Sequence, residues 1–161
     1  VVVLDDYLSL NDIDIVDLNP TLGLFPPPGR EDEVYRALAG AHPRLKVFRK
    51  AETPAHWHYS EHPRIPPIVG VVDEGWQILR RATFNNLIAK GEHGPMGVHG
   101  YDAMEAQTMR GIFIASGPAF KVGATVPPFE NVHIYDALAK ILGVTPAKND
   151  GDPQIAQTLL R

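Results

Sequence analysis

The chain has 161 residues, a hydrophobic fraction of 44% and a charged fraction of 21%, values typical of a globular protein with a sizeable core. Its net charge of -4 gives no basic surface for nucleic acid, and the absence of Cys excludes disulfides, iron–sulfur clusters and thiolate zinc sites. Any metal must therefore be held by His and carboxylate side chains.

The length predicts a single domain over residues 1–161. Because the sequence begins with Val1 and not with Met, we expect it to be a piece of a longer polypeptide. No apolar run approaches the roughly 18 residues that a membrane span requires, so we expect none.

The first elements alternate between strands and a helix. Residues 1–4 are apolar and predict a strand that passes into one helical turn. Residues 12–18 alternate polar and apolar types, which indicates a strand with one buried face, and residues 21–25 are expected to pair with it. Acidic residues at 31–33 suit the first turn of a helix, and a further alternating strand is predicted at 45–49.

The next segment is rich in His and aromatic residues. His56 and His58 would point the same way from a strand and could then bind a metal. However, Pro54 and Pro63 favour a loop that packs on the core. Both interpretations stay open from the residues alone.

A β-branched run at 68–73 predicts a strand buried on both faces of a mostly parallel sheet. Residues 76–80 are expected to return along it as a hairpin closed by residues 74–75. Asp73 lies at the carboxyl end of the strand, where α/β folds bind ligands, but it can equally serve as a turn-former.

The strongest candidate for chemistry is His99, in the stretch Gly-Val-His-Gly-Tyr-Asp at 97–102. The flanking glycines let the backbone turn and let a ligand approach the imidazole. Tyr101 and Asp102 offer a hydroxyl and a carboxylate that could orient a metal-bound His. His93 is a weaker candidate in the same loop, and a solvated His in a glycine-rich turn is the plain structural alternative.

The last third is expected to contain a buried strand at 111–117 and a helix at 132–142. Asn131 is the expected N-cap of this helix and Gly143 its C-terminal cap. The tail at 149–161 predicts a turn followed by a short helix.

Five phrases occur in one order along the chain, at 59–68, 73–76, 97–102, 109–121 and 128–133. Together they resemble the C-terminal part of the nucleotide pyrophosphatase/phosphodiesterase family, within the alkaline phosphatase superfamily. The resemblance covers most of the chain, and the ordered set is far more specific than an isolated Gly-x-His-Gly.

This resemblance implies an α/β fold, the C-terminal part of an alkaline-phosphatase-like α/β/α sandwich with a mostly parallel sheet. It implies two Zn²⁺ ions that bind the phosphate in the intact enzyme, and a Thr nucleophile. The glycine-flanked His of the family is a zinc ligand, which carries over to His99. The nucleophile and the remaining ligands belong to segments that precede such a part, so this chain is expected to be inactive alone.

The resemblance further implies a nucleotide or another small phosphodiester as substrate, and a periplasmic or extracellular location. Two alternatives remain at the level of sequence. The intact protein could be a phosphomonoesterase, sulfatase or phosphonate hydrolase of the same superfamily. Or the chain could be a non-catalytic binding domain in which His99 is only a turn residue.

Overall fold

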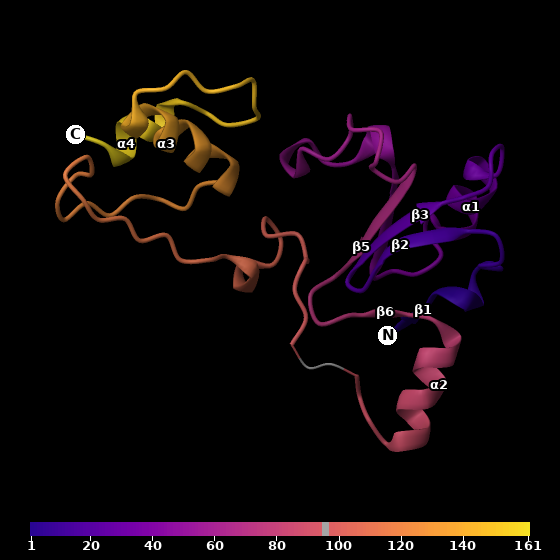
Figure 1. The fold of residues 1–161 in the computed structure, drawn as a ribbon. Helices are drawn as coiled ribbons and strands as arrows, with labels where there is room; N and C mark the ends of the chain where they lie inside the picture. Colours follow the sequence, from indigo (N-terminus) through magenta and orange to yellow (C-terminus); the bar gives the residue numbers. More distant parts are fainter. Residues whose placement is uncertain (95–96) are drawn as a thin grey trace. The chain divides into compact units, whose positions relative to one another are not determined.

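The structure, a computed structural model, describes residues 1–94 and 97–161. The chain forms two compact units, Val1–Gly111 and Ile112–Arg161, shown from indigo to yellow along the sequence in Figure 1. The single domain expected over 1–161 stays a prediction.

The first unit is built on a four-stranded sheet. Its strands are β2 (Asp14–Leu18), β3 (Thr21–Phe25), β4 (Leu45–Arg49) and β5 (Ile68–Val72), in the order β2-β3-β5-β4. Every neighbouring pair in this sheet is antiparallel. The strands expected at 12–18, 21–25, 45–49 and 68–73 are confirmed, as is the pairing of the first two.

Strand β5 lies inside the sheet, and all five of its residues are buried. Gly70 sits at its centre, where an added Cβ would lie 3.0 Å from the Lys46 carbonyl oxygen and 3.3 Å from Leu22 Cβ. The expected burial of this run is confirmed, but the expected parallel pairing is wrong for it. A continuous apolar run reports burial on both faces, whereas the connections on either side decide the direction of pairing.

Parallel pairing occurs in a separate two-stranded sheet, between β1 (Val2–Val3) and β6 (Ile78–Leu79). The turn expected before β6 does form, because Trp76 N–H donates to the Asp73 carbonyl at 3.0 Å and Gly75 has φ of 81°. The expected hairpin is nevertheless wrong. The chain leaves β5 after the turn, and the buried Ile78 and Leu79 pair with β1 instead.

Helix α1 (Glu31–Leu38) packs on the core through Val34 and Leu38, and the helix expected there is confirmed. Its Asp32 carboxylate pairs with Arg49 Nη1 of β4 at 2.7 Å. Within the helix, Arg36 Nε donates to the Asp32 backbone carbonyl at 3.1 Å.

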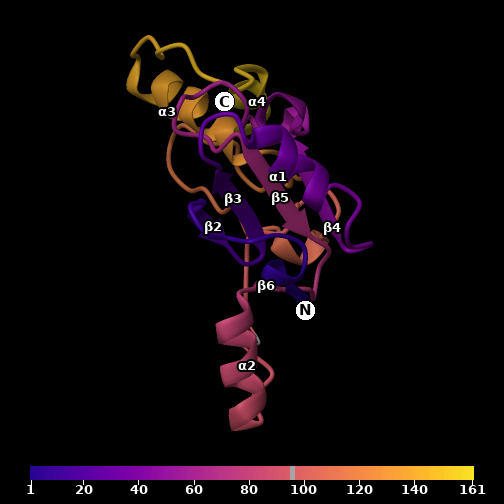
Figure 2. The same cartoon turned by 90° about the vertical axis from the view of Figure 1, so that its right-hand side faces the viewer.

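Helix α2 (Arg81–Lys90) was not expected from the sequence. Only a few of its residues are even half-buried, Phe84 and Leu87 among them, so its apolar spacing is weak. Its start is fixed from outside, since Arg81 N–H donates to Asp5 Oδ2 at 2.8 Å. Figures 1 and 2 show the helix extending away from the four-stranded sheet.

The second unit contains α3 (Ile134–Leu142) and α4 (Gln154–Leu159), which share a small core with the strand-like bridge of Phe120 to Leu160. Both expected helices are confirmed, and Gly143 caps α3 with φ of 68°. The N-cap expected at Asn131 is wrong, because a 3₁₀ turn already begins at this residue.

The strand expected at 111–117 is also wrong. Ile112 is 89% exposed and Ile114 is 86% exposed, and the segment has no regular structure. Phe113 packs edge-on against Phe129, with ring centroids 5.1 Å apart. An apolar run becomes a strand only where a neighbouring strand pairs with its backbone, and none of the described strands does so here.

In the part of the chain that the structure describes, no helix has both the length and the apolar character to cross a membrane. The apolar side chains of the first unit are gathered instead in one core between the sheet, α1 and β6.

The core gives a first prediction. Replacing Leu24, which is fully buried in β3, by Ala should lower the free energy of unfolding by about 2–5 kcal/mol, because apolar burial is lost and a cavity remains. The matched control Val16→Ala, at a 53% exposed position of β2, should change it by less than about 1 kcal/mol. Urea unfolding followed by tryptophan fluorescence measures both, since Trp57 and Trp76 lie in the first unit. Equal midpoints for the two variants would contradict this core.

Candidate functional site

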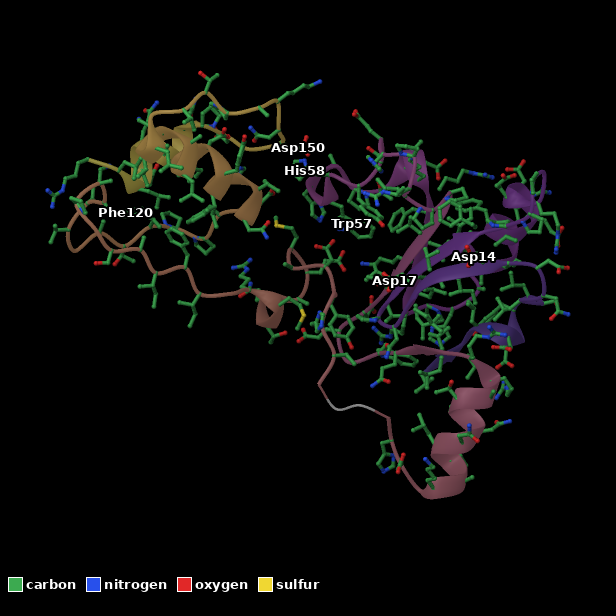
Figure 3. All side chains as sticks on the ribbon, viewed as in Figure 1. Asp14, Asp17, Trp57, His58, Phe120 and Asp150 are labelled. Atoms are coloured by element: carbon green, nitrogen blue, oxygen red, sulfur yellow. The ribbon has the colours of Figure 1, made fainter. Side chains whose placement is uncertain are left out.

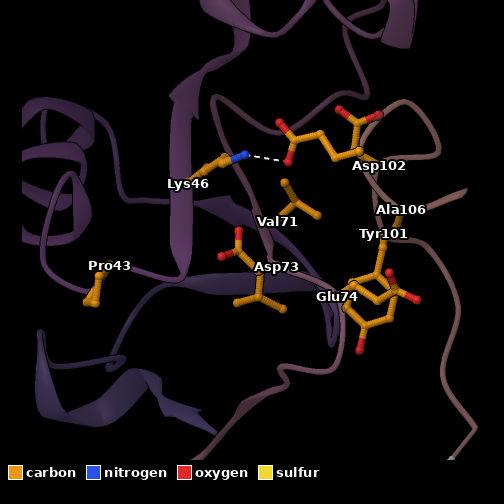
Figure 4. A pocket seen from close by; sticks show the side chains of 10 residues that line it. Pro43, Lys46, Val71, Asp73, Glu74, Tyr101, Asp102 and Ala106 are labelled. Atoms are coloured by element: carbon orange, nitrogen blue, oxygen red, sulfur yellow. Dashed lines mark hydrogen bonds and ion pairs between the residues drawn. The ribbon is translucent and has the colours of Figure 1, made fainter.

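The candidate site lies where β5 ends and the segment after the glycine-rich loop passes beside it. A shallow, open pocket of about 460 Å³ occupies this position (Figure 4). It is lined by Pro43, Lys46, Val71, Val72, Asp73, Glu74, Tyr101, Asp102, Glu105 and Ala106. Four of the ten residues are acidic, so the charges around the pocket decide what it can bind.

Each of these carboxylates is already engaged. Their partners are Arg44 for Asp73, Thr108 for Glu74, Lys46 for Glu105, and His56 with Trp57 for Asp102. Among the described residues, no three His, Cys, Asp or Glu side chains are grouped so that they could hold a metal ion. The acidic side chains around the pocket are therefore all paired, and the described side chains do not form a complete metal site.

His99 is exposed, in a stretch without regular secondary structure. Gly100 after it has φ of 108°, a conformation that favours glycine, and an added Cβ would meet nothing nearer than the Pro20 ring at 3.6 Å. An added Cβ at Gly97 would meet no atom within 4 Å. The imidazole is thus accessible, and the expected role of the glycines is consistent with this geometry.

Tyr101 does not turn toward His99. Its side chain is buried, and its hydroxyl donates to the Trp76 carbonyl at 2.8 Å. Burial raises the pKa of Tyr101, and the nearby Glu74 carboxylate raises it further. The phenol therefore stays protonated and ties the segment after His99 to the turn that follows β5.

Asp102 is the most strongly held carboxylate of the site, with a side chain that is only 9% exposed. It accepts from Trp57 Nε1 at 3.0 Å and from Met104 N–H at 2.9 Å, and His56 Nε2 lies 3.0 Å and 3.1 Å from its two oxygens. A carboxylate can only accept, so Nε2 carries the hydrogen in this arrangement.

These contacts also explain the titration of Asp102. Burial alone would raise its pKa, but the hydrogen bonds from Met104, Trp57 and His56 outweigh burial, and the pKa is lowered. The carboxylate is thus stabilised in its charged form by groups other than His99. From the sequence, Asp102 was expected to orient the His99 imidazole directly. None of these hydrogen bonds of Asp102 involves His99.

The remaining candidate residues from the sequence have other contacts or positions than His99. Asp73 pairs with Arg44 Nη1 at 3.1 Å, and its backbone carbonyl closes the turn to Trp76, so it acts as the turn-former. His93 is exposed in the loop after α2. His58 has φ of 49° and follows a 3₁₀ turn, so it does not share a strand face with His56. The expected loop at 53–64 is confirmed.

Sequence reasoning missed the role of His56 and Trp57 as partners of Asp102. They lie 46 and 45 residues before it, and Figure 3 shows Trp57 in the loop that precedes β5. The available signal was the unusual density of His and aromatic residues in that loop. Such density indicates ring N–H groups that need hydrogen-bond acceptors, but it does not identify the acceptor residue.

The solved structures give the class of protein. An inactive variant of murine ectonucleotide pyrophosphatase/phosphodiesterase 5, in complex with AMP, matches 98% of this chain and 40% of that chain, with a TM-score of 0.79 and 36% identity. The chain is therefore an α/β protein with the alkaline-phosphatase-like fold, as the sequence phrases implied.

The sequence comparison narrows the class to a family. The family sequence model described as type I phosphodiesterase / nucleotide pyrophosphatase matches residues 1–102, so the chain belongs to that family. It is 39% identical over 150 residues to mouse ectonucleotide pyrophosphatase/phosphodiesterase family member 7, and 37% identical over 157 residues to human member 5. These matches cover 92% and 98% of this chain but 32% and 31% of the relatives, so the chain spans about a third of their length.

The lowered pKa of Asp102 gives a second prediction. A carboxylate whose pKa is lower in the folded than in the unfolded state stabilises the fold above the unfolded pKa, and this stabilisation is lost as the pH falls through the folded value. Asp102→Asn should therefore cost about 1–3 kcal/mol at neutral pH, through lost charge-assisted hydrogen bonds. The difference from the wild type should shrink below about pH 4.

Urea unfolding followed by circular dichroism from pH 7 to pH 3 measures this difference. Asp14→Asn, at an exposed position of β2, is the control for the general effect of removing one negative charge. A stability difference for Asp102→Asn that stays constant across this range would contradict the assigned hydrogen bonds.

Proposed function

We propose that the intact protein hydrolyses phosphodiester or pyrophosphate bonds of nucleotides, and that this chain supplies the C-terminal part of its catalytic region. Membership of the type I phosphodiesterase/nucleotide pyrophosphatase family carries this proposal. The murine relative whose structure contains AMP supports a nucleotide as the bound molecule.

We further propose that His99 is the one zinc ligand that this chain contributes to a two-zinc centre. An exposed imidazole between glycines suits Zn²⁺, which takes His nitrogen as a ligand, and it can be approached without displacing other side chains. Among the described residues, no three potential ligands are grouped together. In this proposal, the other ligands and the Thr nucleophile belong to residues outside this chain. Bound zinc would supply electrostatic stabilisation of the phosphate oxygens during displacement.

In this proposal, neighbouring residues of the chain position the His99 imidazole. Gly100 allows the backbone turn that presents the imidazole, and the buried Tyr101 fixes the segment immediately behind it. The pocket beside β5 contributes no ligand, since its carboxylates are satisfied by neighbouring side chains. His93 and Asp73 are weaker candidates for the site, because the family resemblance carries over to His99 and because Asp73 is paired with Arg44.

The proposed ligand is tested in the intact protein by His99→Ala, with His93→Ala as the control from the same loop. We expect His99→Ala to lose bound zinc and to lower kcat/KM for a nitrophenyl phosphodiester by more than about 100-fold, because removing a direct ligand should exceed the effect of removing an outer partner. His93→Ala should retain both. Elemental analysis gives the zinc content. Full zinc occupancy and turnover in His99→Ala would show that the ligand assignment is wrong.

Residues 1–161 expressed alone are expected to show no zinc-dependent cleavage of phosphodiesters, because the chain provides one ligand and no nucleophile. The measurement compares this chain with the intact protein against nitrophenyl phosphodiester and monoester substrates. Turnover by the chain alone that disappears in His99→Ala would overturn the division of the site proposed here. A preference of the intact protein for monoesters would overturn the substrate class.

A further inference from the structure

We propose that Asp102 is a positioning residue for His99, and that it acts through the loop at 53–59 and not through the imidazole. This inference rests on the proposed function, because it assumes that His99 is a zinc ligand. The cluster of His56, Trp57 and Asp102, called here the loop clamp, fixes the backbone that follows the ligand.

The loop clamp joins two segments that are distant in sequence. Trp57 Nε1 and His56 Nε2, both in the 3₁₀ turn Ala55–Trp57, meet the Asp102 carboxylate at 3.0 Å each. Met104 N–H adds a third contact at 2.9 Å, from within the segment of Asp102 itself. A carboxylate held from three sides has little freedom to move, so its backbone is fixed as well.

The 53–59 loop is itself anchored to the sheet. Thr53 Oγ1 donates to the carbonyl of Lys50 or of Tyr59, which lie 3.0 Å and 2.9 Å away, and this closes the loop on itself. The Trp57 ring packs edge-on against Phe48 of β4, with centroids 5.4 Å apart. The loop clamp therefore connects Asp102, through Trp57, to strand β4 of the sheet and not only to a surface loop.

Only two residues separate His99 from this anchor. Gly100 is in a restricted backbone conformation, and Tyr101 is buried with its hydroxyl bonded to Trp76. On the other side of His99, Gly97 is open, whereas Val98 is half-buried against the core. The His99 backbone is thus held by the Val98 contact before it and by the two constrained residues after it, and a displacement of Asp102 is passed to His99 through these two residues.

This matters because a metal ligand must be held to within about 0.5 Å of its working position. Outer groups that orient metal ligands commonly contribute 10–100-fold to metal affinity. Asp102 would supply such a contribution without touching the imidazole, through the hydrogen bonds of a carboxylate that is 9% exposed.

The test uses the intact protein and compares Asp102→Asn with Asp14→Asn. Asp14 is the matched control, since it is an exposed aspartate of β2 that does not line the pocket. Zinc affinity is measured by competition with a chelator, kcat and KM with a nitrophenyl phosphodiester, and backbone order at 97–104 by hydrogen exchange. His99→Ala is included as the reference for loss of the ligand.

We expect Asp102→Asn to lower zinc affinity about 10–100-fold, to lower kcat more than KM changes, and to speed exchange at 97–104. Asp14→Asn should leave all of these unchanged. If Asp102→Asn does not fold, Trp57→Phe and His56→Leu each remove one donor of the loop clamp, and each should lower zinc affinity by a smaller factor of about 3–10.

Wild-type zinc affinity in Asp102→Asn, or in both donor variants, would overturn the positioning role while leaving the proposed function intact, provided His99→Ala abolishes zinc binding. A His99→Ala protein with normal zinc affinity and turnover would instead overturn the proposed function, and this inference with it. A uniform loss of thermal stability with unchanged zinc affinity would assign the loop clamp a purely structural role.

Discussion

The full burial of β5 is the constraint on which the rest of the first unit depends. Because every residue of this strand is covered, its backbone must be paired on both sides, and β3 and β4 provide this pairing. Gly70 lets a neighbouring strand and side chain approach closely at its centre. The strand therefore ends at one defined point, and the turn from Asp73 to Trp76 is held there.

That turn connects the sheet to the candidate site. Its Trp76 carbonyl accepts the Tyr101 hydroxyl, and Tyr101 lies two residues after His99. Asp102 adds a second link, to the loop before β5, through Trp57 and His56. The segment after the exposed histidine is thus attached to the turn that follows this buried strand, by a phenol, and to the loop that precedes the strand, by a carboxylate. An exposed ligand can be well positioned when the residues behind it are buried and hydrogen-bonded.

Much of the fold could be predicted from the sequence, for reasons that are local. The alternation at 45–49 and the acidic first turn at 31–33 depend on neighbouring residues alone, and both elements are present. The partner of each strand was harder to predict. The pairing of β6 with β1, and the exposed course of 111–117, depend on which backbone is available nearby, and a pattern of apolar residues does not contain this information.

The same distinction between local and distant signals applies to the candidate site. His99 was selected because glycines on both sides of a histidine are a local signal, and its role as a metal ligand stays a prediction. The partners of Asp102 were not found, because they lie more than forty residues away and their side chains meet it only in three dimensions. Weak periodicity likewise hid α2, whose start depends on Asp5 of a distant segment.

The backbone of Gly100 has a consequence for how this site can vary. Its surroundings leave ordinary van der Waals space for a methyl group, with the nearest ring carbon of Pro20 at 3.6 Å, yet φ of 108° disfavours every residue of L configuration. The restriction is therefore one of chirality and not of room. Among the genetically encoded amino acids, only the achiral one adopts this conformation without strain, so the residue beside the imidazole has no conservative replacement.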